Sequence, residues 1–114
     1  MALVFVSYSR KDETFVRGLV DDLRQNGIPI WFDRDNIPPG VDWDIAIEHA
    51  LEDASHMLLV LSKSSVASKN VRDEIAVALD EGKAIIPILI DNCKPPLRIR
   101  RIPTLVQSIL STLL

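Results

Sequence analysis

Three short apolar runs constrain the fold of this chain more than any other feature of its sequence. They span residues 3–6, 56–61 and 84–90, and hardly a polar side chain interrupts them. A strand that is apolar at consecutive positions has both faces covered, which is typical of a parallel sheet between layers of helices. The segments 13–25 and 68–80 carry apolar residues at helical spacing. This alternation predicts a single flavodoxin-like α/β domain, with a parallel sheet of about five strands and helices on both faces.

The segment after the first helix is less regular. Residues 28–32 are predicted as a short edge strand, because Pro29 near its start cannot donate a ladder hydrogen bond. Residues 33–40, "DRDNIPPG", are predicted as a loop, since two prolines and a glycine favour turns. A helix is expected to begin at Asp42, with Trp43 on its apolar face.

Prolines also mark the last third of the chain. Pro87 within the run 84–90 predicts a bulge, or pairing on one side only, at that point of the strand. Residues 97–102 are expected to form a short last strand. Pro103 suits the first turn of a terminal helix that runs to Leu114.

Composition narrows the classes of function. A net charge of −3 and a pI of about 5.3 argue against a general nucleic-acid binder. The short basic group of Arg98, Arg100 and Arg101 is expected to be a solvated loop. No apolar run approaches the length of a membrane span, and the N-terminus has no secretory signal pattern.

Cysteine and histidine content bears on disulfides, cellular location and metal binding. Cys93 is the only cysteine, so no internal disulfide can form, and a reducing, cytoplasmic location is expected. His49 and His56 lack cysteine or acidic partners at metal-ligand spacing, so no metal site is predicted. Because the chain starts and stops at structured-looking segments, residues 1–114 are expected to be one domain of a longer multidomain protein.

Ligands of doubly wound sheets bind at the carboxyl ends of the strands, so the residues that follow each strand are the candidates for a site. Tyr8 and Trp43 are aromatics in polar surroundings there, and Asp33 ends a strand. Trp43 is equally well explained as a core residue of its helix. Glu74 stands beside Val71 at the edge of the apolar stripe of its helix. Periodicity alone favours a purely structural explanation for Glu74, with no role in binding or catalysis.

Two such explanations are available. Glu74 could be a first-turn glutamate that interacts with the helix dipole. It could also form a surface ion pair with Lys69 or Arg72. A functional carboxylate is the third alternative, and composition and periodicity favour the first two over it.

Three stretches together resemble one known family. "VFVSYSRKD" followed by a helix resembles the opening strand and loop of a TIR (Toll/interleukin-1 receptor/resistance) domain. "GIPIWFDRDNIPPGVDWDIAIEHAL" resembles its second strand, BB loop and following helix, and "MLLVLSKSSVASKNVRDEIAVAL" its third strand and the helix that carries the family's glutamate. The resemblance runs from Val4 to about Ile90, and the short loops look more prokaryotic than animal-receptor-like.

In the enzymatic branch of the family, the resemblance implies cleavage of NAD+ at the nicotinamide–ribose bond, with Glu74 as the catalytic glutamate. One carboxylate suffices for this chemistry. Glycosidases need an acid as well, because an alkoxide leaves poorly, whereas the pyridinium of NAD+ departs as neutral nicotinamide. The carboxylate then has to orient the ribose hydroxyls and stabilise an oxocarbenium-like cation.

The resemblance also implies two further sets of residues. The BB loop, Asn36, Ile37, Pro38, Pro39 and Gly40, implies assembly with other TIR domains. Many enzymatic members have an aromatic, usually tryptophan, four residues before the glutamate, where this chain has Asn70. The residues implied to bind NAD+ follow the strands or precede Glu74: Ser7, Tyr8, Ser9, Arg10, Asp33, Arg34, Trp43, Ser62, Ser68 and Asn70.

The resemblance therefore implies an NAD+ nucleosidase or ADP-ribosyl cyclase that acts in bacterial antiviral defence. NAD+ would be its substrate and no cofactor is expected. Other TIR domains would be its partners in a homo-oligomer or filament, with no nucleic acid and no membrane bound. The alternative is a non-catalytic TIR scaffold that acts by homotypic assembly, which Asn70 favours.

Two related folds fit less well. A phosphoacceptor receiver domain would need clustered acids after the first strand and an aspartate after the third, where this chain has Ser7 and Ser62. Nucleoside deoxyribosyltransferases use a related sheet and a glutamate for similar glycosidic chemistry. The BB-loop pattern disfavours them.

Overall fold

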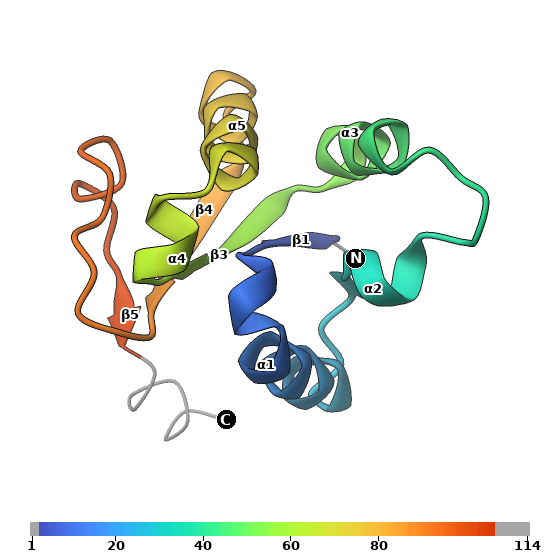
Figure 1. Cartoon of the computed structure of the whole chain (residues 1–114), viewed down its shortest axis with the longest axis horizontal. Helices are drawn as coiled ribbons and strands as arrows, with labels where there is room; N and C mark the ends of the chain where they lie inside the picture. Colours follow the sequence, from blue (N-terminus) through green and yellow to red (C-terminus); the bar gives the residue numbers. More distant parts are fainter. Residues whose placement is uncertain (1–2, 107–114) are drawn as a thin grey trace.

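A parallel sheet of five strands forms the centre of the computed structural model, which describes residues 3–106 (Figure 1). The strand order is β2-β1-β3-β4-β5, and every neighbouring pair is parallel. The predicted flavodoxin-like α/β fold is confirmed. The strands are β1 (Val4–Ser7), β2 (Ile30–Trp31), β3 (His56–Leu61), β4 (Ala84–Leu89) and β5 (Leu105–Val106).

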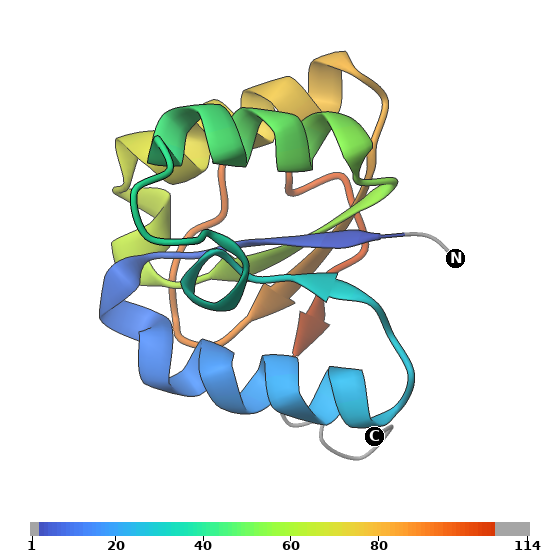
Figure 2. The same cartoon turned by 90° about the vertical axis from the view of Figure 1, so that its right-hand side faces the viewer.

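Helices cover both faces of the sheet. Helices α3 (Trp43–Asp53) and α5 (Lys69–Asp80) lie on one face, and α1 (Glu13–Gln25) lies on the other (Figure 2). Three shorter helices lie in the connections: η1 (Arg10–Asp12), α2 (Asp33–Asn36) and α4 (Lys63–Val66). Within residues 3–106, none of the helices has the length and apolar character needed to cross a membrane.

Side-chain capping sets where α3 and α5, the two helices that share one face of the sheet, begin. The Asp42 carboxylate accepts a hydrogen bond from the backbone N–H of Ile45 at 3.1 Å, which starts α3 as predicted. The Ser68 hydroxyl accepts from the N–H of Val71 at 3.3 Å and starts α5 in the same way.

Alternation along β1 divides the buried side chains into two cores. Phe5 packs with residues of α3 and α5 on one face, and Val6 packs with α1 on the other. Successive side chains of a strand point to opposite faces. Ser7 therefore follows Phe5 onto the face of α3 and α5, while Tyr8 joins Val6 on the face of α1.

Two expectations for residues 28–40 are corrected in part. The edge position of the second strand is confirmed, but β2 contains two residues only. The expected loop 33–40 begins with the helical turn α2, because the Asn36 side chain accepts a hydrogen bond from the N–H of Phe32 at 2.9 Å. The loop proper is left to residues 37–42.

At Pro87, one of the two expected alternatives is found. The register between β3 and β4 continues without a bulge, with Leu59 opposite Pro87, and β5 pairs only from Ile88 onward. Pro87 is therefore paired on one side only among the described residues, and its missing N–H leaves no gap in the ladder.

The expected last strand at 97–102 is wrong, because this segment forms turns. The Pro96 carbonyl accepts hydrogen bonds from the N–H groups of Ile99 (2.9 Å) and Arg100 (3.2 Å), which closes the chain into a compact turn. The strand lies instead at β5, where the first turns of a helix were expected. The remainder of that expected helix, residues 107–114, lies outside the described residues.

Ile99 anchors this irregular segment. It is fully buried in the core on the α3 and α5 face, whereas Leu97 is 66% exposed. We expect Ile99→Ala to lower the free energy of unfolding by about 2–4 kcal/mol, because truncation leaves a cavity. The matched change Leu97→Ala should alter it by less than about 0.5 kcal/mol. Urea denaturation of both variants measures this, and equal losses would contradict the anchoring role.

Candidate functional site

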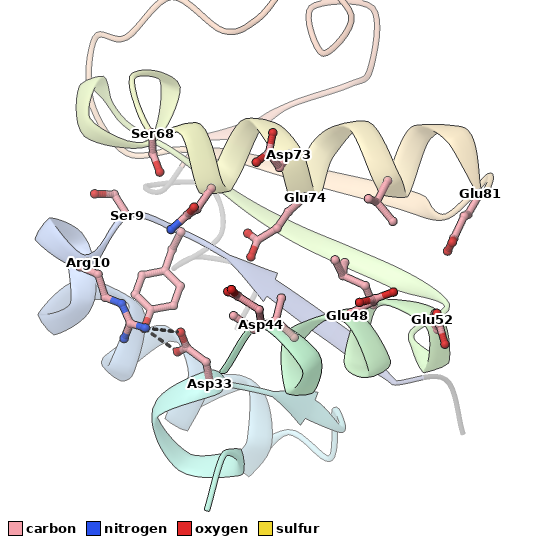
Figure 3. Close-up of a pocket in the computed structure, with 15 residues that line it drawn as sticks. Ser9, Arg10, Asp33, Asp44, Glu48, Glu52, Ser68, Asp73, Glu74 and Glu81 are labelled. Carbon is pink, nitrogen blue, oxygen red and sulfur yellow. Dashed lines mark hydrogen bonds and ion pairs between the residues drawn. The ribbon is translucent and has the colours of Figure 1, made fainter. Parts of the chain in front are cut away.

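A cavity of about 450 Å³ lies between α3 and α5 at the end of β1 (Figure 3). Its walls come from four parts of the chain: the segment after β1, the end of β2, and the facing sides of the two helices. The lining residues are Tyr8, Ser9, Arg10, Asp33, Asp44, Ile47, Glu48, Leu51, Glu52, Ser68, Asn70, Asp73, Glu74, Val77 and Glu81.

Glu74 extends from α5 and its carboxyl group points into the space between α5 and α3 (Figure 3). Both structural explanations for this residue, the interaction with the helix dipole and the surface ion pair, are wrong. Helix α5 begins at Lys69, so Glu74 lies in its second turn, and the first turn has no acidic residue. Lys69 pairs with Asp73 at 2.8 Å, and no ion pair of Glu74 occurs in the described part of the chain.

The Glu74 carboxylate is held by Ser7, the last residue of β1. The Ser7 hydroxyl donates a hydrogen bond to Oε1 of Glu74 at 2.7 Å, across 67 positions of sequence. Ser7 itself is fully buried and does not line the cavity. Its contact with the cavity is therefore made through Glu74.

Burial changes the acidity of this carboxyl group. It raises the pKa of Glu74 from an ordinary 4.5 to about 7. The Ser7 hydrogen bond and the charge of Arg10 act in the opposite direction, whereas the charges of Asp33 and Asp73 raise the pKa further. Glu74 therefore exchanges its proton near neutral pH, as a general base at that pH requires.

A second cluster closes the end of the cavity beside β1. Asp33 accepts a hydrogen bond from the Tyr8 hydroxyl at 2.7 Å and pairs with Arg10 at 3.1 Å. Burial, followed by the hydrogen bond to Asp33, raises the pKa of Tyr8, so Tyr8 stays a neutral donor. The Arg10 guanidinium lies 4.7 Å from the centre of the Trp43 ring, a cation–π contact. Trp43 is 38% exposed and so is not the core residue that helix packing would give.

The other residues implied by the family resemblance fall into two groups. Ser9, Ser68 and Asn70 line the cavity together with the residues already described. Arg34 lies outside the lining: it pairs with Glu13, and its guanidinium is 5.8 Å from the Trp43 ring centre. Ser62 is also outside it, because its hydroxyl caps α4 and donates to Asp12.

Sequence reasoning missed the acidic walls of the cavity. Asp44, Glu48 and Glu52 of α3 recur every four residues and therefore share one side of the helix, a signal that could have been read. Asp73 of α5 and Glu81, which directly follows α5, add to them, and Figure 3 shows Glu52 and Glu81 at the end away from Arg10. In residues 3–106 no three potential ligands gather in a way that could hold a metal ion.

The fold agrees with comparison against known families. The TIR domain family matches residues 4–109, so the chain belongs to the TIR domain family. One of its relatives is named as an NAD+ hydrolase. The chain is 31% identical over 90 residues to NAD(+) hydrolase TcpC of Escherichia coli O6:H1 strain CFT073, a match that covers 74% of this chain and 29% of that protein.

Two further relatives bear names that point to cyclic products. The chain is 28% identical over 92 residues to the probable 2' cyclic ADP-D-ribose synthase TcpO of Methanobrevibacter olleyae, covering 77% of this chain and 27% of that protein. It is 28% identical over 89 residues to 2' cyclic ADP-D-ribose synthase BtTIR of Bacteroides thetaiotaomicron, covering 74% and 31%. The chain thus matches less than a third of the length of these relatives.

Solved structures share the fold. The TIR domain of the Toll-related receptor TRR-2 from Hydra magnipapillata superposes with a TM-score of 0.84 at 23% identity, covering 96% of this chain and 86% of that one. A metazoan TIR-STING receptor from C. gigas superposes with a TM-score of 0.78 at 20% identity, covering 95% and 38%. At such low identities the likeness shows the fold alone.

The raised pKa of Glu74 predicts a pH-dependent cost in stability. Between an unfolded pKa of 4.5 and a folded pKa of about 7, the folded protein binds more protons than the unfolded chain. Stability therefore falls as pH rises through this window. Glu74→Gln cannot ionise. We expect its gain in free energy of unfolding over wild type to be about 3 kcal/mol larger at pH 8 than at pH 4.

Urea denaturation of both proteins at the two pH values measures this difference. Asp80→Asn changes a carboxylate at the exposed end of the same helix and should show no such pH dependence. An equal effect of Glu74→Gln at both pH values would contradict the burial of an ionising group.

Proposed function

We propose that this chain is an NAD+-cleaving TIR domain, an NAD+ nucleosidase or ADP-ribosyl cyclase that breaks the nicotinamide–ribose bond. The observation that carries the proposal is the carboxyl group of Glu74, which has a pKa of about 7 and points into the cavity. The names of three relatives, one NAD+ hydrolase and two cyclic ADP-D-ribose synthases, support the same class of substrate.

The proposed chemistry needs one carboxylate. The bond between the ribose C1′ and the pyridinium nitrogen breaks, and both of its electrons go to the nitrogen, so nicotinamide leaves neutral. Ionised Glu74 stabilises the developing oxocarbenium ion. Water, or a hydroxyl of the same nucleotide in the cyclase reaction, then attacks C1′, and its proton passes to Glu74.

The cluster around Arg10 supports the proposed placement of the diphosphate. Arg10 is the only basic residue among the described residues that line the cavity, and Ser9 and Ser68 lie at the same end (Figure 3). A guanidinium suits a diphosphate. We propose that Arg10 shares its charge between Asp33 and the diphosphate, with Trp43 stacked behind it.

The central test is Glu74→Gln. With the protein assembled at high concentration, we expect the release of nicotinamide from NAD+ to fall about 100-fold or more, because the group that stabilises the cation is lost. Liquid chromatography of the nucleotide products measures it and also separates ADP-ribose from cyclic products. Asp80→Asn, a carboxylate change on the same helix outside the cavity, should retain full activity.

Two results would contradict the enzymatic proposal. One is that wild-type protein releases no nicotinamide under conditions in which it assembles. The other is that Glu74→Gln releases nicotinamide at the wild-type rate.

The second candidate is a non-catalytic scaffold that acts only by homotypic assembly. The observation that favours it is Asn70, which lines the cavity where many enzymatic members have an aromatic residue. In either case we propose other TIR domains as partners, in a homo-oligomer or filament formed through the BB loop. The proposed setting is antiviral defence in a bacterial cytoplasm, with NAD+ as substrate and no separate cofactor.

Gly40 allows the role of the BB loop to be tested. Its φ of 83° is a conformation that L side chains rarely adopt, so Gly40→Glu must reshape the loop. If neighbouring copies complete the site, assembly and activity should be lost together, as followed by light scattering and nicotinamide release. Gly27→Glu imposes the same strain at a φ of 81° at the far end of α1, and should keep both. Full activity in a strictly monomeric Gly40→Glu protein would contradict a shared site.

A further inference from the structure

Ser7 is a polar residue at a position that would otherwise belong to the core. It follows Phe5 onto the sheet face covered by α5, where Phe5 is 2% exposed and packs in the same core as Ile75. Ser7 is 0% exposed. A buried hydroxyl costs free energy unless a hydrogen bond compensates it, so a serine here needs a partner.

That partner is Glu74. The Ser7 hydroxyl donates to Oε1 at 2.7 Å, and among the hydrogen bonds of residues 3–106 it is the one donor to this carboxylate. The bond attaches one carboxylate oxygen to the end of β1. The second oxygen is left to the cavity into which the side chain points (Figure 3).

We propose that Ser7 is a positioning residue for Glu74: its hydroxyl holds one carboxylate oxygen, aims the other at the ligand, and stabilises the ionised form. Ser7 does not bind the ligand itself. The proposal deepens the proposed NAD+-cleaving function, but its effect on the titration of Glu74 holds whether or not NAD+ is cleaved.

The charged surroundings show why this one hydrogen bond matters. Asp33 of α2 and Asp73 of the same helix α5 oppose ionisation of Glu74, and Arg10 of η1 favours it. Asp44 and Glu48 of α3 line the same cavity and add negative charge, while Tyr8 is a neutral donor held by Asp33. Arg10 is already paired with Asp33, so Ser7 is the direct donor that favours ionised Glu74.

The test measures Glu74 directly, by NMR titration of the 114-residue chain labelled with 13C at glutamate carboxyl carbons. Glu74→Gln assigns the signal. We expect Ser7→Ala to raise the pKa of Glu74 by about one unit, since a hydrogen bond to the charged form is lost. Ser7→Thr keeps the hydroxyl and should restore the wild-type pKa. Ser65→Ala removes another fully buried hydroxyl, one that donates to the Ser62 carbonyl and not to Glu74, and should leave the pKa of Glu74 unchanged.

Activity gives a second readout that separates positioning from binding. At pH 7, kcat/KM of Ser7→Ala should fall about fivefold, because a rise of one unit lowers the ionised fraction from about a half to about a tenth. The loss should diminish toward pH 9 with KM unchanged. A raised KM that high pH does not restore would overturn the proposal and make Ser7 a ligand-binding residue.

Other outcomes are equally decisive. If Ser7→Ala does not fold, Ser7→Cys keeps nearly the same volume with a much weaker donor, and should still raise the pKa of Glu74. An unchanged pKa in whichever of these two variants folds would overturn the positioning role. A raised pKa in a protein that cleaves no NAD+ would uphold it while the proposed function fails.

Discussion

The rest of the structure depends on the burial of β3 on both of its faces. Its residues Met57–Leu61 are each no more than 5% exposed, and β1 and β4 pair along its two sides. Such a strand requires helices above and below, which α3, α5 and α1 provide (Figure 2). Because all strands run in one direction, the segments that follow them meet at one edge of the sheet. The cavity between α3 and α5 is a consequence of this arrangement.

At that edge the molecule keeps a group that is costly to bury. An ionised carboxylate loses hydration on burial, and one hydroxyl from Ser7 offsets only part of the cost, as the raised pKa of Glu74 shows. The nearby acids Asp33 and Asp73 add to the cost. Functional sites are commonly places where a protein keeps such a group at the expense of stability.

The acidic walls give the cavity a marked asymmetry of charge. Arg10, with Ser9 and Ser68, lies at one end, and Glu52 and Glu81 lie at the other (Figure 3). A ligand with an anionic part and a cationic ring can be oriented by such a gradient of potential. This asymmetry combines the segment after β1 with the ends of α3 and α5, so it appears only when these separate parts of the chain come together.

Much of the fold could be predicted from local pattern. Apolar runs identified β1, β3 and β4, and helical spacing with caps at Asp42 and Ser68 identified α3 and α5. Prediction failed where local and tertiary forces differ. Residues 97–102 have strand-like alternation, yet Ile99 is buried in the core, Ile102 packs against the same core, and the chain turns around them. Residues 33–36 have a loop-like composition, yet the Asn36 side chain closes them into a helical turn.

Glu74 illustrates which properties of a residue can be predicted from sequence and which depend on tertiary structure. The sequence by itself determined the alternation of strands and helices, the TIR resemblance, and a carboxylate at the edge of an apolar stripe, because these depend on the order of residues along the chain. Only the tertiary structure decided that Glu74 is partly buried, that Ser7 is its donor 67 positions away, and that Arg10 is already paired with Asp33. Those properties depend on which groups the fold brings together and on how much water it removes from around them, and no local pattern encodes either.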